Sequence, residues 1–135
     1  MKKRSKVRIP VTQGLKDVYA MDMHLPYQSA CAGQFNVVAF SRLAAAISVV
    51  RTALDQTGKG SPEAVAALDQ AVETLLEIRH RGDGGGVWEI NETERPVVLA
   101  GIQAAEECIG ILSVDRLQAA ADTLLMQLAN EPAAA

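Results

Sequence analysis

Residues 40–54 read FSRLAAAISVVRTAL and carry the clearest fold signal in the chain. Apolar residues recur in this stretch at alternating spacings of three and four: Phe40, Leu43, Ile47, Val50 and Leu54. This spacing places them on one stripe of an α-helix, whereas a half-buried strand would show a period of two. The sequence therefore predicts an amphipathic helix from about Ser29 to Gln56, which Gly58 and Gly60 end.

A second helix and a glycine-rich break follow this first helix. Ser61 has the position of an N-cap and Pro62 that of the first helical residue, so a helix is predicted up to about Arg81. Residues 82–86 read GDGGG, interrupt the helical pattern and are expected to form a flexible hinge. Residues 87–90 alternate apolar and polar side chains, which predicts a short extended segment.

Two more helices are predicted in the last third of the chain. Asn91 and Glu94 have the spacing of a capping box, and Pro96 is tolerated only in a first turn, so the third helix is expected to begin near Asn91 or Thr93. Ser113 is expected to cap a fourth helix with almost no linker before it. The third and fourth helices then form either a tight corner or one kinked rod, and a continuous rod would favour a dimer.

Length and composition agree with one small helical domain. The chain has 135 residues, of which 49% are hydrophobic, so it is too short for a multidomain enzyme and too apolar for a fully disordered chain. We expect an all-α fold, an antiparallel bundle of about four helices. It would comprise a basic flexible tail at residues 1–10, a single helical domain at 11–130 and a frayed C-terminus at 131–135. Residues 11–28 have the weakest pattern, and any short helix there is expected to be interrupted at Pro26.

Charge is distributed unevenly along the chain. Residues 1–8 contain five basic residues and no acidic one, whereas the remaining chain has 8 basic and 16 acidic residues. An acidic body repels phosphates, so nucleic-acid binding would have to use the tail, and otherwise the tail is a solvated terminus. Alternatively, the acidic body mimics nucleic acid toward a basic site on a host protein. The candidate phosphate-binding residues are Lys2, Lys3, Arg4, Lys6 and Arg8.

The cysteines and the apolar segments indicate a cytoplasmic location. Cys31 and Cys108 form no CxxC motif, and both fall in apolar helical patterns where a free cysteine is usually a buried hydrophobe. No apolar run of the kind found in signal peptides follows the basic start, and no uncharged apolar window approaches 18 residues. We therefore expect a soluble cytoplasmic protein without a membrane partner.

The residues with catalytic or metal-binding chemistry do not form a recognisable site. Glu77 and His80 have the Glu-x-x-His spacing of di-iron bundles, with Glu73 one turn earlier, but the second motif is missing and the other histidine is His24. Residues 58–61 lack the spacing of a phosphate-binding loop. Either cysteine would need one of the two histidines as a base. We therefore expect a protein that is not an enzyme and holds no metal, cofactor or small-molecule substrate.

Two aromatic residues are candidates for partner binding. Trp88, the single tryptophan, lies beside the glycine-rich segment and either covers the end of the bundle or anchors a partner. Tyr27, in the run His24-Leu25-Pro26-Tyr27, belongs either to a packed connection or to a docking loop. Both alternatives stay open for each residue.

Three short stretches resemble uncharacterised small helical proteins encoded on proteobacterial phages, prophages and plasmids. These stretches are KKRSK at residues 2–6, LPY at 25–27 ahead of an alanine-rich helix, and INETE at 90–94. The chain departs from that group at residues 7–10, which read VRIP where a Tyr-Arg-Pro run is expected. The resemblance implies an accessory protein of a mobile element and carries no site residues. We thus expect a homodimer that binds nucleic acid through its tail or, alternatively, acts as an anti-defence inhibitor or adaptor on a host protein.

Overall fold

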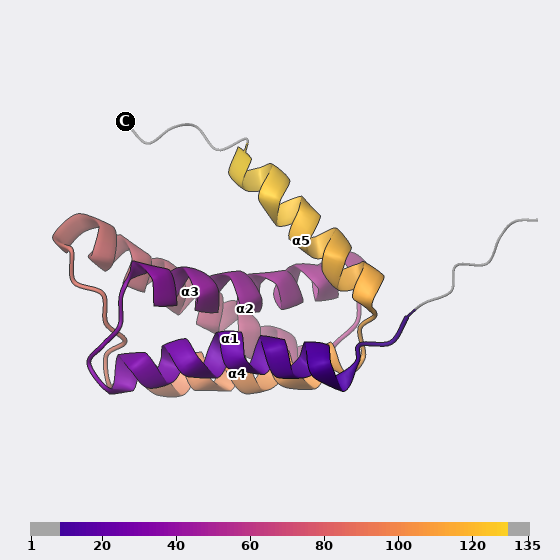
Figure 1. Ribbon diagram of the computed structural model, residues 1–135, viewed down its shortest axis with the longest axis horizontal. Helices are drawn as coiled ribbons and strands as arrows, with labels where there is room; N and C mark the ends of the chain where they lie inside the picture. Colours follow the sequence, from indigo (N-terminus) through magenta and orange to yellow (C-terminus); the bar gives the residue numbers. More distant parts are fainter. Residues whose placement is uncertain (1–8, 130–135) are drawn as a thin grey trace, which may run out of the picture.

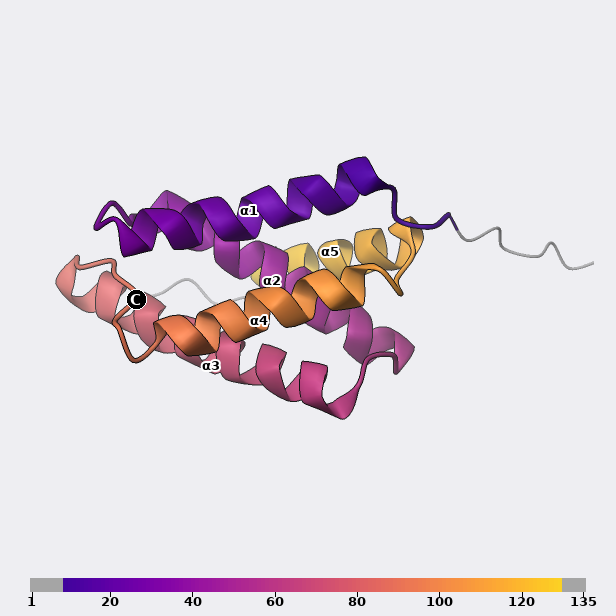
Figure 2. The same cartoon turned by 90° about the horizontal axis from the view of Figure 1, so that it is seen from below.

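The computed structural model describes residues 9–129 and contains five α-helices. Figures 1 and 2 show the first four side by side, while the fifth leaves the end of the molecule where the fourth finishes and runs obliquely over the second. The all-α prediction is confirmed, but the simple bundle of about four helices is not. The helices are α1 (Gln13–Cys31), α2 (Val37–Thr57), α3 (Pro62–Gly85), α4 (Arg95–Ile109) and α5 (Val114–Ala129).

The additional helix arises because a turn divides the segment that was expected to be continuous from Ser29. α1 ends at Cys31, and Gly33 takes a left-handed φ of 75° that L side chains rarely adopt. Asn36 then caps α2, since its side-chain oxygen accepts a hydrogen bond of 2.9 Å from the Ala39 N–H. The predicted start of the helix at Ser29 is therefore wrong, whereas its end near Thr57 is right.

Pro26 lies inside α1 and does not interrupt it, contrary to the expectation for residues 11–28. Proline removes one backbone hydrogen bond from a helix. This loss is offset by tertiary packing, because Met23, Pro26 and Ala30 lie on one face of α1 and are all buried. α1 begins at a Thr12 cap, whose hydroxyl accepts a hydrogen bond of 3.2 Å from the Leu15 N–H.

α3 begins as predicted and ends later than predicted. The Ser61 hydroxyl accepts a hydrogen bond of 3.1 Å from the Ala64 N–H, with Pro62 in the first turn. The helix continues through Gly85 and stops at Gly86, which has a φ of 74°. The expected hinge at residues 82–86 is thus wrong, and the residues 87–90 that follow form neither helix nor strand.

α4 starts near the predicted position. Residues 92–94 form a turn, and the Glu94 carboxylate accepts a hydrogen bond of 2.9 Å from the Asn91 N–H, which is one half of the expected capping box. Pro96 lies in the first turn of α4, where its missing N–H has no intrahelical partner in any case.

α4 and α5 are separate helices joined by a tight corner at residues 110–113. The Val114 N–H donates to the carbonyl of Ile9 at 3.0 Å, so the chain that precedes α1 is held against this corner. The Ser113 hydroxyl is buried and has no hydrogen-bond partner among the described residues, so the expected Ser113 cap is absent. Because the two helices are not one rod, the corresponding argument for a dimer no longer holds.

α2 is the central helix, because it contacts all four other helices. It is also the one helix within residues 9–129 whose length and composition would allow it to cross a membrane. Within its apolar window, 39% of this helix is buried against the rest of the described chain. Its buried residues include Phe40, Leu43, Ile47, Val50 and Leu54, the predicted stripe, together with Ala46, Val49 and Ala53.

Candidate partner-binding groove

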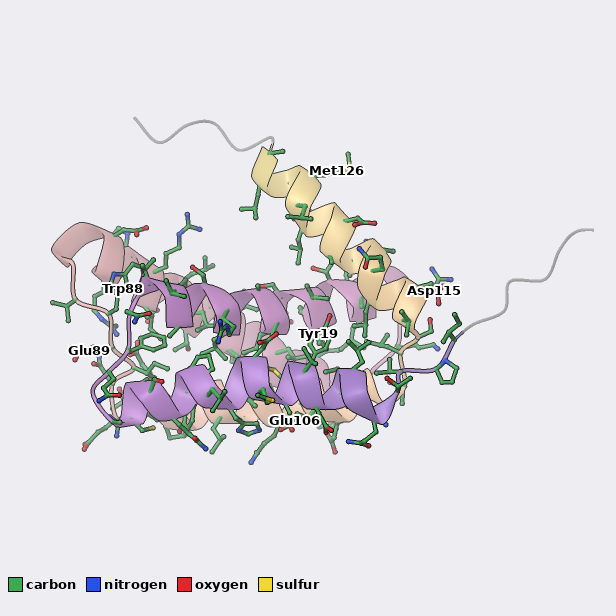
Figure 3. All side chains as sticks on the ribbon, in the orientation of Figure 1. Tyr19, Trp88, Glu89, Glu106, Asp115 and Met126 are labelled. Carbon is green, nitrogen blue, oxygen red and sulfur yellow. The ribbon has the colours of Figure 1, made fainter. Side chains whose placement is uncertain are left out.

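α5 is held to the rest of the molecule by α2 alone among the described helices. Near its start, Leu117 and Ala120 are buried. Toward its end, α5 diverges from α3 and its large apolar side chains become exposed, and Figure 3 shows Met126 on the side directed away from the body. Three leucine and methionine side chains in this last part are more than half exposed: Leu125 at 64%, Met126 at 66% and Leu128 at 58%.

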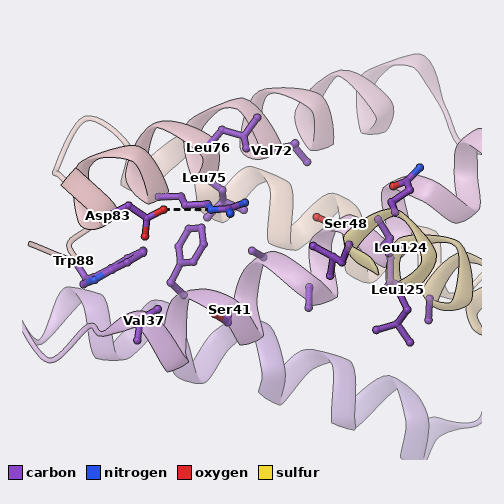
Figure 4. A pocket seen from close by; sticks show the side chains of 18 residues that line it. Val37, Ser41, Ser48, Val72, Leu75, Leu76, Asp83, Trp88, Leu124 and Leu125 are labelled. Atoms are coloured by element: carbon purple, nitrogen blue, oxygen red, sulfur yellow. Dashed lines mark ion pairs between the residues drawn. The ribbon is translucent and has the colours of Figure 1, made fainter. Parts of the chain in front are cut away.

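The divergence of α5 leaves an open groove of about 820 Å3 between α2, α3 and α5. We call it the α2–α3–α5 groove. Figure 4 shows Leu75 and Leu76 of α3, Leu124 and Leu125 of α5, and Trp88 around the same space. The floor belongs to the core, because Phe40 and Val49 of α2 are buried beneath it. The groove therefore presents an apolar surface that is continuous with the core of the protein.

The polar residues of the groove carry no net charge. Arg79 and Asp83 face each other across one turn of α3, with the Arg79 Nε and Asp83 Oδ2 3.5 Å apart (Figure 4). The remaining polar lining residues are uncharged: Ser41, Ser48 and Gln127. A groove with an apolar floor, in which the charges of Arg79 and Asp83 neutralise each other, favours an uncharged, apolar ligand over an ion.

Trp88 closes one end of the groove. Its ring lies against Phe40 with the ring centroids 5.1 Å apart, and it fills the position that a side chain at residue 82 would occupy. Gly82 is therefore required by close packing and not by helix termination. Trp88 is half-buried on the core, as a lid would be, and the same side chain lines the groove.

Tyr27 lies outside the groove. It is half-buried on α1 and packs on the core, and its hydroxyl donates a long hydrogen bond of 3.5 Å to the Arg95 carbonyl. Burial raises the pKa of Tyr27, and the nearby Cys31 adds to this rise. Tyr27 therefore belongs to helix α1, not to a connection or a loop, and contacts the start of α4.

The two cysteines have different environments. Cys31 is exposed, so the expectation that it is buried is wrong: it lies at the end of α1, beside the turn that the sequence pattern did not reveal. Cys108 is buried as expected, and burial, followed by the charge of Glu107, raises the pKa of its thiol. A raised pKa keeps a thiol protonated and therefore poorly nucleophilic.

The acidic and histidine residues do not converge. Glu73, Glu77 and His80 are all exposed on α3. Within residues 9–129 no group of three or more histidine, cysteine or acidic side chains is arranged to hold a metal ion. His24 instead pairs with Glu106, their Nε2 and Oε1 atoms 2.8 Å apart, which links α1 to α4. No local pattern could reveal this pair, because its members are 82 positions apart.

A polar clamp fixes the segment that carries Trp88. The guanidinium of Arg81 donates two hydrogen bonds, of 2.8 and 2.9 Å, to the Glu94 carboxylate and a third, of 2.9 Å, to the Glu89 carbonyl. Burial alone would raise the pKa of Glu94, but the Arg81 hydrogen bonds, the Asn91 N–H and the Arg81 charge together outweigh burial and lower it. The clamp thereby holds Trp88 at the end of the groove.

The predicted phosphate-binding residues Lys2, Lys3, Arg4, Lys6 and Arg8 lie outside the described residues, as does the predicted frayed terminus at 131–135. The structure does show where the tail joins the body. Ile9 and Pro10 are exposed and lie beside the α4–α5 corner (Figure 1).

Comparison with known proteins identifies no relative of this chain. No protein-family model, no curated protein and no solved structure matches it. The resemblance to proteins of phages and plasmids therefore stays a prediction, and the groove is the feature from which a function can be argued.

Proposed function

We propose that this protein is a non-enzymatic protein-binding module whose α2–α3–α5 groove takes an apolar helix of about two turns from its partner. The observation that carries the proposal is the groove itself, an open apolar space continuous with the core. The largest exposed apolar patch on a protein is often a site of interaction.

The size of the groove supports a helical ligand. An α-helix is a cylinder roughly 10 Å across that rises about 5.4 Å per turn, so two turns occupy roughly 850 Å3. The groove has about the same volume, 820 Å3. A helix also satisfies its own backbone hydrogen bonds, which a groove with so few polar lining groups would leave unpaired in an extended peptide.

The environment of the reactive residues supports a binding function over catalysis. His24 is engaged with Glu106 on the side of α1 and α4, and His80 is exposed on α3. Cys108 is buried with a raised pKa. Nucleophilic catalysis by a cysteine requires a base within hydrogen-bond reach of the thiol. The groove is lined instead by aliphatic and aromatic side chains, which suit binding.

The proposal is tested with a synthetic amphipathic helix of about 14 residues carrying leucines on one face, long enough to form a helix on binding. Because Trp88 is the single tryptophan and lines the groove, its fluorescence reports directly on occupancy. We expect a saturable change in Trp88 emission as the peptide is added. Leu125→Glu should lower the affinity for the peptide at least tenfold. Met21→Glu is the matched control, because Met21 is also exposed, at 57%, but lies on α1 away from the groove.

Two results would contradict the proposal. One is the absence of any saturable change up to millimolar peptide. The other is equal weakening by Leu125→Glu and Met21→Glu, which would indicate nonspecific adhesion to exposed apolar side chains. Circular dichroism on each variant verifies that its helical content equals that of the wild type.

A second candidate function, nucleic-acid binding through the tail, rests on the five basic residues of 1–8 and their attachment beside the α4–α5 corner. If these residues neutralise phosphates, affinity for mixed-sequence DNA or RNA falls steeply with salt. We expect deletion of residues 1–8 to abolish this binding, and retention of binding by the deleted chain would rule the tail out. The mobile-element setting and cytoplasmic location remain predictions under either function.

A further inference from the structure

We infer that the helix which occupies the α2–α3–α5 groove is α5 of a second copy of this chain, in a two-fold symmetric dimer. This inference rests on the proposed function, because it names the partner of the same groove.

The end of α5 has the chemistry that the groove accepts. Residues 124–129 read LLMQLA and contain no ionisable side chain, which suits a groove whose one charged pair is neutralised within itself. At 1.5 Å per residue these six residues extend about 9 Å, close to the length of two turns. Leucine and methionine also occupy more than one side of this helical end, and a helix that is apolar on several sides requires cover on several sides.

The position of α5 makes the pairing self-complementary. α5 forms one wall of its own groove and also presents the uncovered side chains of Leu125 and Met126. When two copies meet about a two-fold axis, each α5 is at once a wall for its own groove and the ligand of the other. Such an isologous contact closes on itself and leaves no further groove open, so it produces dimers and not filaments.

The exposed area is sufficient for a weak dimer. At roughly 60 Å2 per half-exposed aliphatic side chain, five such residues present about 300 Å2 of apolar surface per copy. Since apolar atoms make up about 57% of an interface, two copies would bury about 1,000 Å2 in total, the lower limit for a specific interface. The five residues are Val37, Leu76, Leu125, Met126 and Leu128.

The ends of the chain fit the groove less well. Residues 1–8 carry five basic side chains, which an apolar groove would have to desolvate. Residues 130–135 read NEPAAA and offer no apolar side chain larger than proline or alanine. α1 also exposes Val18, Met21 and Leu25, but Asp22 lies among them, whereas residues 124–129 contain no ionisable side chain.

The test is sedimentation equilibrium of the full chain between about 1 and 500 µM, the range in which a small interface dissociates. We expect a monomer–dimer equilibrium. Leu125→Glu on α5 and Leu76→Glu on α3 should each raise the dimer dissociation constant at least tenfold. Met21→Glu, an equivalent change on α1, should leave the equilibrium unchanged. The emission of Trp88 should shift with protein concentration in the wild type and in Met21→Glu, and stay constant in the two groove variants.

The inference is overturned if the wild type is monomeric throughout this range, if the dimer withstands Leu125→Glu, or if Met21→Glu dissociates it. Each substituted side chain is already more than half exposed, so the variants are expected to fold. A monomeric wild type that still binds the synthetic helix in a Leu125-dependent way would refute the second copy and retain the proposed function. A monomeric wild type that binds no helix would refute both.

Discussion

Gly82 determines where Trp88 lies. A Cβ at residue 82 would occupy the space of the indole ring, and the ring in turn covers Phe40 and ends the groove. The sequence alone assigned this glycine to a hinge, because a run of glycines usually breaks a helix. The requirement for a missing side chain depends on a residue six positions later and on its rotamer, and neither is visible in a local pattern.

Gly82→Ala is expected to destabilise the protein by about 1–3 kcal/mol, because the methyl group forces Trp88 off Phe40. Thermal unfolding, monitored by circular dichroism, measures this loss of stability. A change in Trp88 emission would show that the loss arises at the indole ring. Gly84→Ala is the matched control in the same helix, since a Cβ there meets nothing within 4 Å. It should be neutral or stabilise the helix by up to about 1 kcal/mol. Equal destabilisation by both variants would contradict the role of Trp88.

Glu94 links stability to pH in a direction fixed by its environment. Because the pKa of Glu94 is lower in the folded than in the unfolded chain, its contribution is complete above the ordinary value of 4.5 and is lost as the pH falls through the lower folded value. Glu94→Gln should reduce the free energy of unfolding by about 1–2 kcal/mol at pH 7, and by progressively less toward pH 3. Chemical denaturation of the wild type and of Glu94→Gln at several pH values measures the two free energies of unfolding. A difference between them that grows as the pH falls would contradict the role of Glu94.

At the scale of helices, the hydrophobic stripe of α2 could be read from the sequence, as could the caps at Ser61 and in part at Glu94. The full length of α1 was not predicted, because Pro26 and a weak apolar pattern argue locally for an interrupted helix, whereas packing on α2 and α4 stabilises a continuous one. The turn at Gly33 was missed although Gly33 and the cap residue Asn36 are the usual stop and start signals of helices. The groove could not be predicted, because it depends on the angle at which α5 leaves the corner after α4.

α3 and α4 approach each other closely where Gly101 faces Ala71. A Cβ at Gly101 would coincide with the side chain of Ala71, so the two helices meet where one side chain is absent. Gly101→Ala alone should destabilise the protein by about 1–3 kcal/mol. Ala71→Gly alone should destabilise it by about 1 kcal/mol through helix propensity.

The double variant separates packing from propensity. If the two positions share one space, combining Gly101→Ala with Ala71→Gly should destabilise by at least about 1 kcal/mol less than the sum of the single changes. Denaturant unfolding of the wild type, the two single variants and the double variant gives the four free energies of this double-mutant cycle. Strict additivity would show that the helices move apart to accommodate the methyl group.

At the scale of the whole molecule, charge is the property that the sequence predicted most directly. Outside residues 1–8 the chain has 8 basic and 16 acidic residues, and four ion pairs between arginine and carboxylate join described side chains. Most of these pairs are exposed and contribute little, so repulsion among the unmatched carboxylates dominates. The sequence could not show which charges pair across helices, as Arg51 of α2 and Asp69 of α3 do.

Raising the NaCl concentration from about 20 to 200 mM should therefore increase Tm by a few degrees at pH 7, because it screens this repulsion. Differential scanning calorimetry at a fixed, low protein concentration measures the effect without a contribution from association. A fall in Tm over the same range would mean that the ion pairs, led by Arg81 with Glu94, outweigh the repulsion.

The attachment of α5 to α2 alone also has a consequence for biosynthesis. α1 to α4 contact one another without using α5, and they leave the ribosome before it does. The four helices can complete their mutual contacts while the last segment is still being translated, and N-terminal parts of a chain generally fold first. Docking of α5 is then expected to be the final step of folding, and until it occurs the face of α2 that α5 covers stays exposed to solvent.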